Sequence, residues 1–213
     1  LTPLQALSDQ SRDWLVVDHY ALDVRWESVL RRVAKGVFVI DDIADRQHDC
    51  DLLLDQNYYA DMNTRYRGKV PPNCRLLLGP SYALLREEFR NMRDQVKPRS
   101  GHVRRILVFF GGVDPDNNTG RALKALALVG LPGVYVDVII GSEHPCREEI
   151  KTECIQRGFA CHVQTVRMAA FMAAADLAIG ACGSATWERC SVGLPAIVLV
   201  VADNQRNAAE DLD

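Results

Sequence analysis

The chain has 213 residues, enough for one large domain or two smaller ones. Its formal net charge is -3 with a pI near 6.0, and it has no run of lysine or arginine, so nothing favours nucleic acid as a partner. Hydrophobic residues make up 48%, yet no segment reaches the roughly 20 apolar residues that span a bilayer, which argues against membrane insertion.

The cysteines argue against a disulfide framework. There are seven, an odd number at scattered positions, and no CxxC pair occurs. They predict reduced thiols in a cytoplasmic protein without structural zinc. We expect no metal and no cofactor, and the sequence gives no indication of the oligomeric state.

The first half of the chain alternates helical spacing with short apolar runs. In chain order, the pattern predicts a helix at 4–12, a strand at 14–17, a helix at 21–35, strands at 36–40, 50–54 and 75–78, and a helix at 85–93. The polar stretch after it contains Pro98 and Gly101, which break regular structure. We expect residues 95–103 to be an interdomain linker.

Beyond the linker the alternation starts again. It predicts strands at 104–110, 134–140, 159–163, 176–179 and 196–201, separated by helices at 119–129, 146–157, 167–175 and 186–192. The strands are uninterrupted Val/Ile/Leu runs, which is typical of parallel strands buried on both faces. The sequence therefore predicts a doubly wound α/β fold.

We expect two Rossmann-like domains, the first of them incomplete. Residues 1–94 would be the C-terminal part of the N-terminal domain, and residues 104–213 a C-terminal nucleotide-binding domain. A βαβ sheet normally begins with a strand, whereas this chain opens on a predicted helix. We therefore expect further residues before Leu1, and also after Asp213, where a predicted helix has nothing following it to pack on.

Two strands of the second half end in small residues. Residues 106–110 lead into Gly111-Gly112, and residues 177–179 lead into Gly180-Ala181-Cys182-Gly183-Ser184. Glycine lets the backbone approach a ligand closely, and amides at a following helix start attract anions. Two such turns in one sheet suggest a diphosphate ligand. The alternative is that both are ordinary strand-to-helix turns.

Polar residues follow the predicted strands, and ligands of open parallel sheets bind at the carboxyl ends of strands. The clusters are Asp18-His19-Tyr20, Asp41-Asp42 and Asp55-Gln56-Asn57-Tyr58, with Asp114, Ser184, Glu188 and Asn204 in the second half. His19 and Tyr20 can form a proton-transfer pair, or the segment can cap the next helix. Asp41-Asp42 can be a carboxylate pair or a metal site, although such residues more often cap helices.

Glu188 follows Ser184 by about one helical turn. A carboxylate there can accept hydrogen bonds from the two hydroxyls of a ribose, while the serine and nearby amides hold phosphate. The alternative is a charge that only stabilises the first turn of a helix. Asn204, just after the last strand, can contact ligand or cap the final helix.

Several strings, in order along nearly the whole chain, resemble the nucleotide-sugar hydrolase family of pseudaminic acid biosynthesis. They include Val17-Asp18-His19-Tyr20 and Leu54-Asp55-Gln56-Asn57-Tyr58. Asp41-Asp42 with residues 48–51 also matches, as above all does 79–89, and the match continues at 110–114, 183–190 and 202–205.

This resemblance implies a two-domain, GT-B-like fold related to the N-acetylglucosaminyltransferase of peptidoglycan synthesis. It implies a metal-independent enzyme that hydrolyses UDP-2,4-diacetamido-2,4,6-trideoxy-β-L-altropyranose with inversion and releases UDP. Tyr20 matches the family's active-site tyrosine. Gly111 and Gly112 match its phosphate-side turn. Ser184, Glu188 and Asn204 match positions that face the uridine diphosphate.

One departure limits the resemblance. The family's catalytic histidine lies in a Gly-x-Gly-His motif, which these 213 residues do not contain, and His19 matches a different histidine. We therefore expect this chain alone to be inactive. Two alternatives stay open, a UDP-sugar glycosyltransferase of the same fold and a non-catalytic nucleotide-sugar-binding protein.

Overall fold

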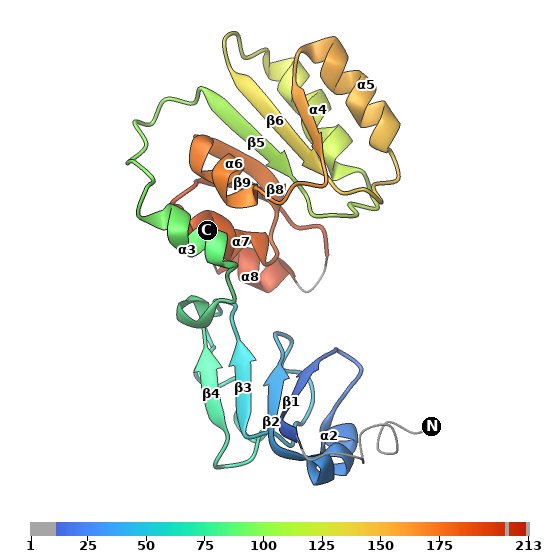
Figure 1. The fold of residues 1–213 in the computed structure, drawn as a ribbon, viewed down its shortest axis with the longest axis vertical. Helices are drawn as coiled ribbons and strands as arrows, with labels where there is room; N and C mark the ends of the chain where they lie inside the picture. The colour runs from blue at the N-terminus through green and yellow to red at the C-terminus, as the bar shows by residue number, and fades with distance from the viewer. Residues whose placement is uncertain (1–11, 203–204, 212–213) are drawn as a thin grey trace. The chain divides into compact units, whose positions relative to one another are not determined.

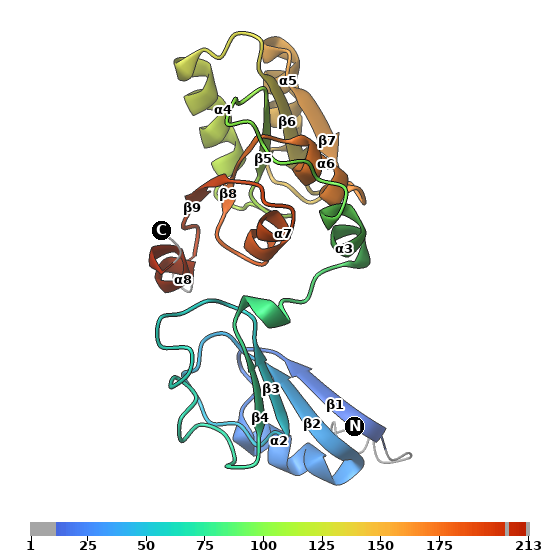
Figure 2. The same cartoon turned by 90° about the vertical axis from the view of Figure 1, so that its left-hand side faces the viewer.

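The computed structural model describes residues 12–202 and 205–211. The contacts divide the chain into two compact units, Leu1–Leu84 with Glu210–Asp213 and Leu85–Ala209. Each unit is built on its own parallel sheet, and each is described separately below (Figures 1 and 2). Of the helix expected at 4–12, only Arg12 is described, and there the first strand begins.

The first unit contains a four-stranded sheet in the order β1-β2-β3-β4, all parallel. Its strands are β1 (Arg12–Asp18), β2 (Ala34–Ile40), β3 (Leu52–Asp55) and β4 (Arg75–Leu78). The connections contain α2 (Val24–Leu30), η1 (Arg31–Val33) and, after β4, η2 (Pro80–Tyr82). The four strands predicted from the apolar runs are therefore present.

Helix α2 is shorter than the helix expected at 21–35. Asp23 caps its start by accepting a hydrogen bond from the Arg25 amide at 2.9 Å. A 3-10 turn, η1, follows, and β2 begins at Ala34. The sequence had predicted that the helix would continue to residue 35. Pairing of β2 along the whole of β1 decides this boundary.

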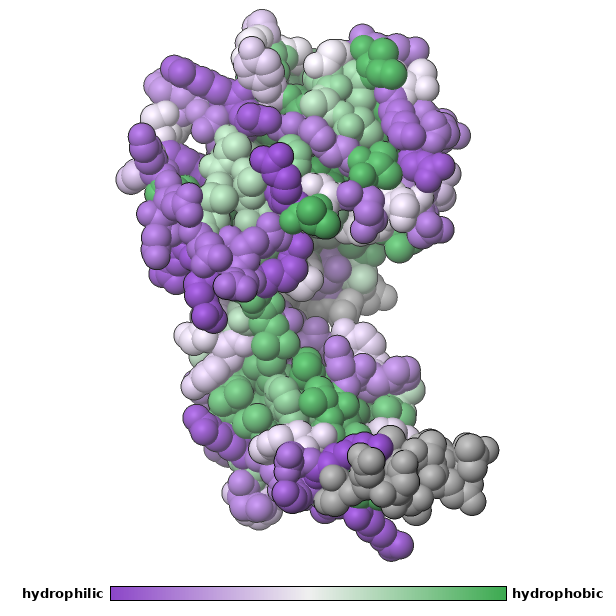
Figure 3. All heavy atoms as spheres, viewed as in Figure 1, coloured by the Kyte–Doolittle hydropathy of each residue, from purple (hydrophilic) through white to green (hydrophobic). Residues whose placement is uncertain are grey.

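Strand β1 is buried on one face only, although the apolar runs predicted strands buried on both faces. Val17 is buried in a cluster with Val37, Val39 and Leu53, which α2 and residues 66–74 also contact. On the opposite face Trp14 and Val16 are 53% and 56% exposed. Figure 3 shows hydrophobic surface over this sheet. Among the described residues, helices cover this sheet less fully than the apolar runs predicted.

The second unit contains a five-stranded parallel sheet in the order β7-β6-β5-β8-β9. Its strands are β5 (Arg105–Phe109), β6 (Tyr135–Ile140), β7 (Ala160–Val163), β8 (Leu177–Ala181) and β9 (Ala196–Leu199). Its helices are α3 (Glu87–Arg93), α4 (Asn118–Val129), α5 (Arg147–Arg157), α6 (Met168–Ala174), α7 (Ala185–Ser191) and α8 (Arg206–Glu210), the last extending into the residues grouped with the first unit.

Alternate residues of β5 point to opposite faces of this sheet. Ile106 and Val108 pack with α4 and α5, whereas Leu107 packs with α3 and α6. Figure 2 shows the helices on both sides of these strands. Burial on both faces explains why β5 reads as one unbroken apolar run.

The boundary between the two units lies between Leu84 and Leu85, before the linker expected at 95–103. Phe89 of α3 is fully buried in the α6 cluster of the second unit. Arg99 then donates hydrogen bonds of 2.7–3.0 Å to four carbonyls of that unit. Contacts therefore group α3 and the expected linker with the second sheet, because Phe89 is buried there and Arg99 binds its carbonyls.

Within the described residues, none of the helices combines the length and the apolar character needed to cross a membrane.

Candidate functional site

The strand order of the second sheet reverses between β5 and β8. Chain order runs from β5 outward to β7 on one side and from β8 to β9 on the other. In open parallel sheets such a reversal leaves a crevice at the carboxyl ends of the two central strands, because their connections leave in opposite directions. Both glycine turns singled out in the sequence, Gly111-Gly112 and Gly183-Ser184, follow these two strands.

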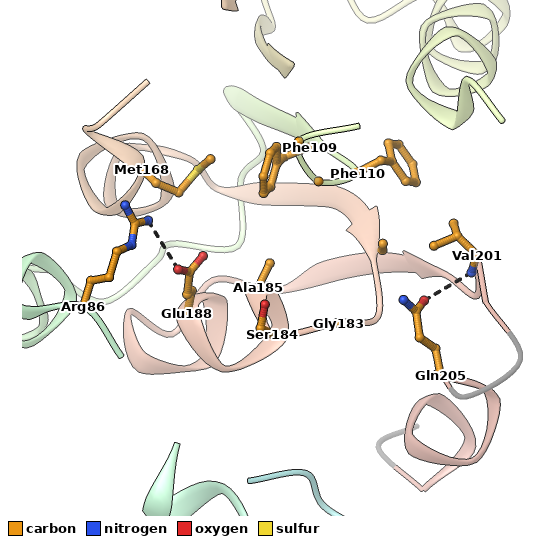
Figure 4. A pocket seen from close by; sticks show the side chains of 13 residues that line it. Arg86, Phe109, Phe110, Met168, Gly183, Ser184, Ala185, Glu188, Val201 and Gln205 are labelled. Atoms are coloured by element: carbon orange, nitrogen blue, oxygen red, sulfur yellow. Dashed lines mark hydrogen bonds and ion pairs between the residues drawn. The ribbon is translucent and has the colours of Figure 1, made fainter. Parts of the chain in front are cut away.

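A pocket of about 370 Å³ lies at this position, within the size range of small-molecule sites. It is lined by both turns and by side chains from several elements of the second unit (Figure 4). The lining residues are Arg86, Phe109, Phe110, Gly111, Gly112, Met168, Ala181, Gly183, Ser184, Ala185, Glu188, Val201 and Gln205. Four of the predicted ligand-binding residues therefore meet in one pocket.

The turn after β5 depends on glycine at two places. Gly111 has a φ of +103°, which a side chain would strain. At Gly141, a Cβ would lie within 1.9 Å of the Gly112 carbonyl oxygen, so the end of β6 must lack a side chain. The turn is thus packed directly against the backbone that follows β6.

Asp114 shapes this turn and does not line the pocket. Its two carboxylate oxygens accept hydrogen bonds from the Asn118 and Thr119 amides at 2.9 and 2.7 Å. Burial raises the pKa of Asp114, but the hydrogen bonds from Thr119 and Asn118 outweigh it and lower the pKa. The first amides of α4 are thereby hydrogen-bonded within the protein. They are therefore not available to a ligand bound at the Gly111-Gly112 turn.

Ser184 and Glu188 lie on the pocket side of α7. Figure 4 shows both side chains pointing toward the space below β5 and β8. The Glu188 side chain is only 18% exposed. Burial raises its pKa, and Arg86 opposes that rise. The pocket therefore presents one half-buried carboxylate beside two backbone turns, which suits a ligand with hydroxyls and an anionic part.

Arg86 is a pocket residue that we did not predict. Its guanidinium contacts the Glu188 carboxylate at 3.3 Å. The sequence signal was its position in the string 79–89, which carried the family resemblance, but nothing local distinguishes it from other surface arginines. Asn204 lies outside the described residues.

Tyr20 belongs to the first unit, at the carboxyl end of β1, and is 58% exposed. The Asp42 carboxylate, whose charge acts on the Tyr20 hydroxyl, accepts a 3.0 Å hydrogen bond from the side-chain amide of Asn57. Burial and then Asp42 raise the pKa of Tyr20 to about 12, so the phenol is neutral at physiological pH. His19 caps the adjoining turn, with Nδ1 accepting from the Ala21 amide at 3.0 Å.

Asp41 and Asp55 stabilise the ends of β2 and β3. The Tyr66 hydroxyl lies 3.0 Å from a carboxylate oxygen of each. Arg46 forms a 2.8 Å ion pair with Asp41. Arg65 lies 3.4 Å from Asp55. Among the described residues no group of three or more acidic, cysteine or histidine side chains is arranged to hold a metal ion.

Comparison with known proteins found similar curated proteins and a similar solved structure. No family model matches the chain. It is 31% identical over 115 residues to the UDP-2,4-diacetamido-2,4,6-trideoxy-beta-L-altropyranose hydrolase of Campylobacter jejuni, a match covering 54% of this chain and 40% of that protein. The spore coat polysaccharide biosynthesis protein SpsG of Bacillus subtilis is 29% identical over 154 residues, covering 71% of this chain and 44% of that protein. The chain thus spans less than half the length of these curated relatives.

Among solved structures, the chain is similar to MurG of Acinetobacter baumannii with a TM-score of 0.55 and 14% identity. The match covers 98% of this chain and 58% of that chain. At this identity the likeness concerns the fold alone. It confirms the predicted fold class, a GT-B-like α/β protein with two parallel sheets.

Proposed function

We propose that this protein acts on a UDP-sugar, with the uridine diphosphate bound in the pocket of the second unit. The observation that carries the proposal is the meeting of the Gly111-Gly112 turn, Ser184 and Glu188 in one pocket at the strand-order reversal. The name of the Campylobacter jejuni relative adds the UDP-sugar chemistry, and the name of the Bacillus subtilis relative adds polysaccharide biosynthesis.

Each part of the pocket has a role in this proposal. Backbone amides of the two turns and the Ser184 hydroxyl hold the diphosphate by hydrogen bonds. The Glu188 carboxylate accepts hydrogen bonds from the ribose hydroxyls, for which it must be ionised. Asp114 keeps the first turn in shape without touching the ligand.

The proposed reaction is hydrolysis at the anomeric carbon. The oxygen of a water forms a bond to that carbon, the bond from the carbon to the diphosphate oxygen breaks, and UDP leaves with the electron pair. The water's proton passes to a base. Amide hydrogen bonds stabilise the charge that develops on the leaving diphosphate. Since the Gly-x-Gly-His motif is absent from this sequence, we expect the chain alone to bind UDP and release none from the sugar.

We assign Tyr20 an orienting role in this reaction. With a pKa near 12 it stays protonated and can position water or a sugar substituent by hydrogen bonding, but it does not act as a base. Tyr20→Phe in the full-length product of the gene should therefore slow UDP release strongly, because the phenyl ring keeps the packing and loses the hydroxyl.

Calorimetry with UDP tests the binding part. We expect the unaltered chain to bind UDP, and Glu188→Gln and Ser184→Ala to weaken binding by about tenfold each, equal to about 1.4 kcal/mol. Glu148→Gln, an exposed glutamate of α5, is the matched control and should bind normally. If neither pocket variant weakens UDP binding, the nucleotide binds elsewhere on the protein.

Product analysis separates hydrolysis from transfer. The full-length protein is incubated with UDP-2,4-diacetamido-2,4,6-trideoxy-β-L-altropyranose in water alone. Release of UDP with free sugar is the result we expect. A glycosyltransferase of this fold would release little UDP until an acceptor is added, and a binding protein would release none under either condition.

A further inference from the structure

The Glu188 carboxylate is held by a residue from outside its own helix. Nη2 of Arg86 lies 3.3 Å from Oε1 of Glu188. Figure 4 shows the guanidinium reaching toward the carboxylate at one end of the pocket. The Glu188 side chain is 18% exposed and the Arg86 side chain 51% exposed, so water reaches the ion pair mainly from the arginine side.

Arg86 is itself held in place. Its Nη1 lies 2.7 Å from Oε1 of Glu88, and the other oxygen of Glu88 accepts a 3.3 Å hydrogen bond from the Ala169 amide at the start of α6. The guanidinium also lies 5.3 Å from the ring centre of Phe89, which is fully buried. The side chain of Arg86 is thus oriented by groups that belong to the packed part of the second unit.

Arg86 is also the main influence that favours the charged form of Glu188. Burial of Glu188 raises its pKa, the charge and hydrogen bond of Arg86 lower it, Glu88 raises it again and Arg189 lowers it. A ribose diol offers two hydroxyl donors, and only an ionised carboxylate has both oxygens free of protons to accept them.

We propose that Arg86 is the positioning residue for ribose recognition, keeping the Glu188 carboxylate turned into the pocket, with Glu88 holding Arg86 for that task. The inference rests on the proposed function, because it takes Glu188 as the ribose-binding group. It assigns Arg86 an action through Glu188 and not through contact with the diphosphate.

Three ligands distinguish these actions. UDP is measured by calorimetry, uridine by NMR titration because it lacks the phosphates, and 2′-deoxy-UDP by calorimetry because it lacks one ribose hydroxyl. In Arg86→Met we expect the affinities for UDP and uridine to fall by the same factor, about tenfold, and the preference for UDP over 2′-deoxy-UDP to shrink. Arg86→Lys should restore part of both. Arg90→Met, an exposed arginine of α3, should bind normally.

A second measurement needs no ligand. Carboxyl carbon NMR of the chain, with Glu188→Gln used to assign the signal, follows the titration of Glu188. Its pKa should be higher in Arg86→Met than in the unaltered chain, because burial then acts without the opposing charge. Thermal unfolding of each variant is the control that tests whether the second unit remains folded.

The outcomes separate the two proposals. If Arg86→Met weakens UDP but leaves uridine unchanged, Arg86 contacts the diphosphate and the inference is wrong. If the titration of Glu188 does not move, the inference is wrong whatever the affinities show. If the unaltered chain binds neither UDP nor uridine, the proposed function fails, and the ribose role of Arg86 fails with it.

Discussion

Asp55 gives the first unit a pH dependence that can be calculated. Its side chain lies at the end of β3, is 2% exposed and contacts the Tyr66 hydroxyl at 3.0 Å. Burial raises its pKa from the ordinary value of 3.8 to about 6, although Asn57, Arg65 and Tyr66 oppose the rise. The folded state therefore binds this proton more tightly than the unfolded state.

The sign and size of the effect follow from that difference. A folded pKa above the unfolded one means that the contribution to stability is fully present below pH 3.8 and is lost as the pH rises through about 6. About two pKa units at about 1.4 kcal/mol each correspond to about 3 kcal/mol. Asp55→Asn removes the titration while keeping a side chain of the same shape.

We therefore expect Asp55→Asn to become more stable relative to the unaltered chain as the pH rises. The difference in the free energy of unfolding of the first unit should change by about 2–3 kcal/mol between about pH 4 and pH 7. Urea unfolding followed by tryptophan fluorescence measures it. Both proteins carry Trp187→Phe, so that Trp14 and Trp26 report on the first unit alone.

Asp61→Asn, an exposed aspartate of the segment between β3 and β4, is the matched control and should show no such change. A difference between Asp55→Asn and the unaltered chain that is the same at both pH values would refute the reasoning. Asp55 would then have the same pKa in the folded and the unfolded state, because its partners would offset the effect of burial.

Other predictions concern the packing of the second unit and the proposed chemistry. Arg99→Ala should lower the free energy of unfolding of the second unit by about 2–4 kcal/mol, since several buried carbonyls lose a charged donor; Trp187 fluorescence in urea measures it. Gly141→Ala should weaken UDP binding more than tenfold in calorimetry, because its Cβ displaces the Gly112 carbonyl; normal affinity would show that the turn adapts. Tyr20→Phe should lower the rate of UDP release by the full-length protein by about a hundredfold or more, and an unchanged rate would remove the hydroxyl from the mechanism.

Much of the second unit was predictable because its central strands β5 and β6 are buried on both faces. Residues 106–109 form an unbroken apolar run in the sequence, and the two glycines that follow indicate the turn. Boundaries were less predictable where neighbours decide them. Helix α2 ends at Leu30 because β2 pairs along β1 from Ala34, a contact that the helical spacing of residues 21–35 does not contain.

The candidate site divides in the same way. The meeting of the Gly111-Gly112 turn with Ser184 and Glu188 was predictable, because parallel strands bring their carboxyl ends to one edge. The role of Asp114 was not, since only the folded turn shows both its oxygens bound to the start of α4. Arg86 was missed because its partner Glu188 is distant in the chain.

The order of apolar runs, helical spacings and glycine turns by itself determined that this protein is a parallel α/β chain with polar residues at the strand ends, because these patterns depend on local backbone geometry and on burial. Only the tertiary structure decided that α3 and Arg99 belong with the second sheet, that Trp14 and Val16 of β1 are exposed among the described residues, and that Arg86 holds Glu188. Each of these depends on which distant side chains share a buried space, and that information arises only when the chain packs.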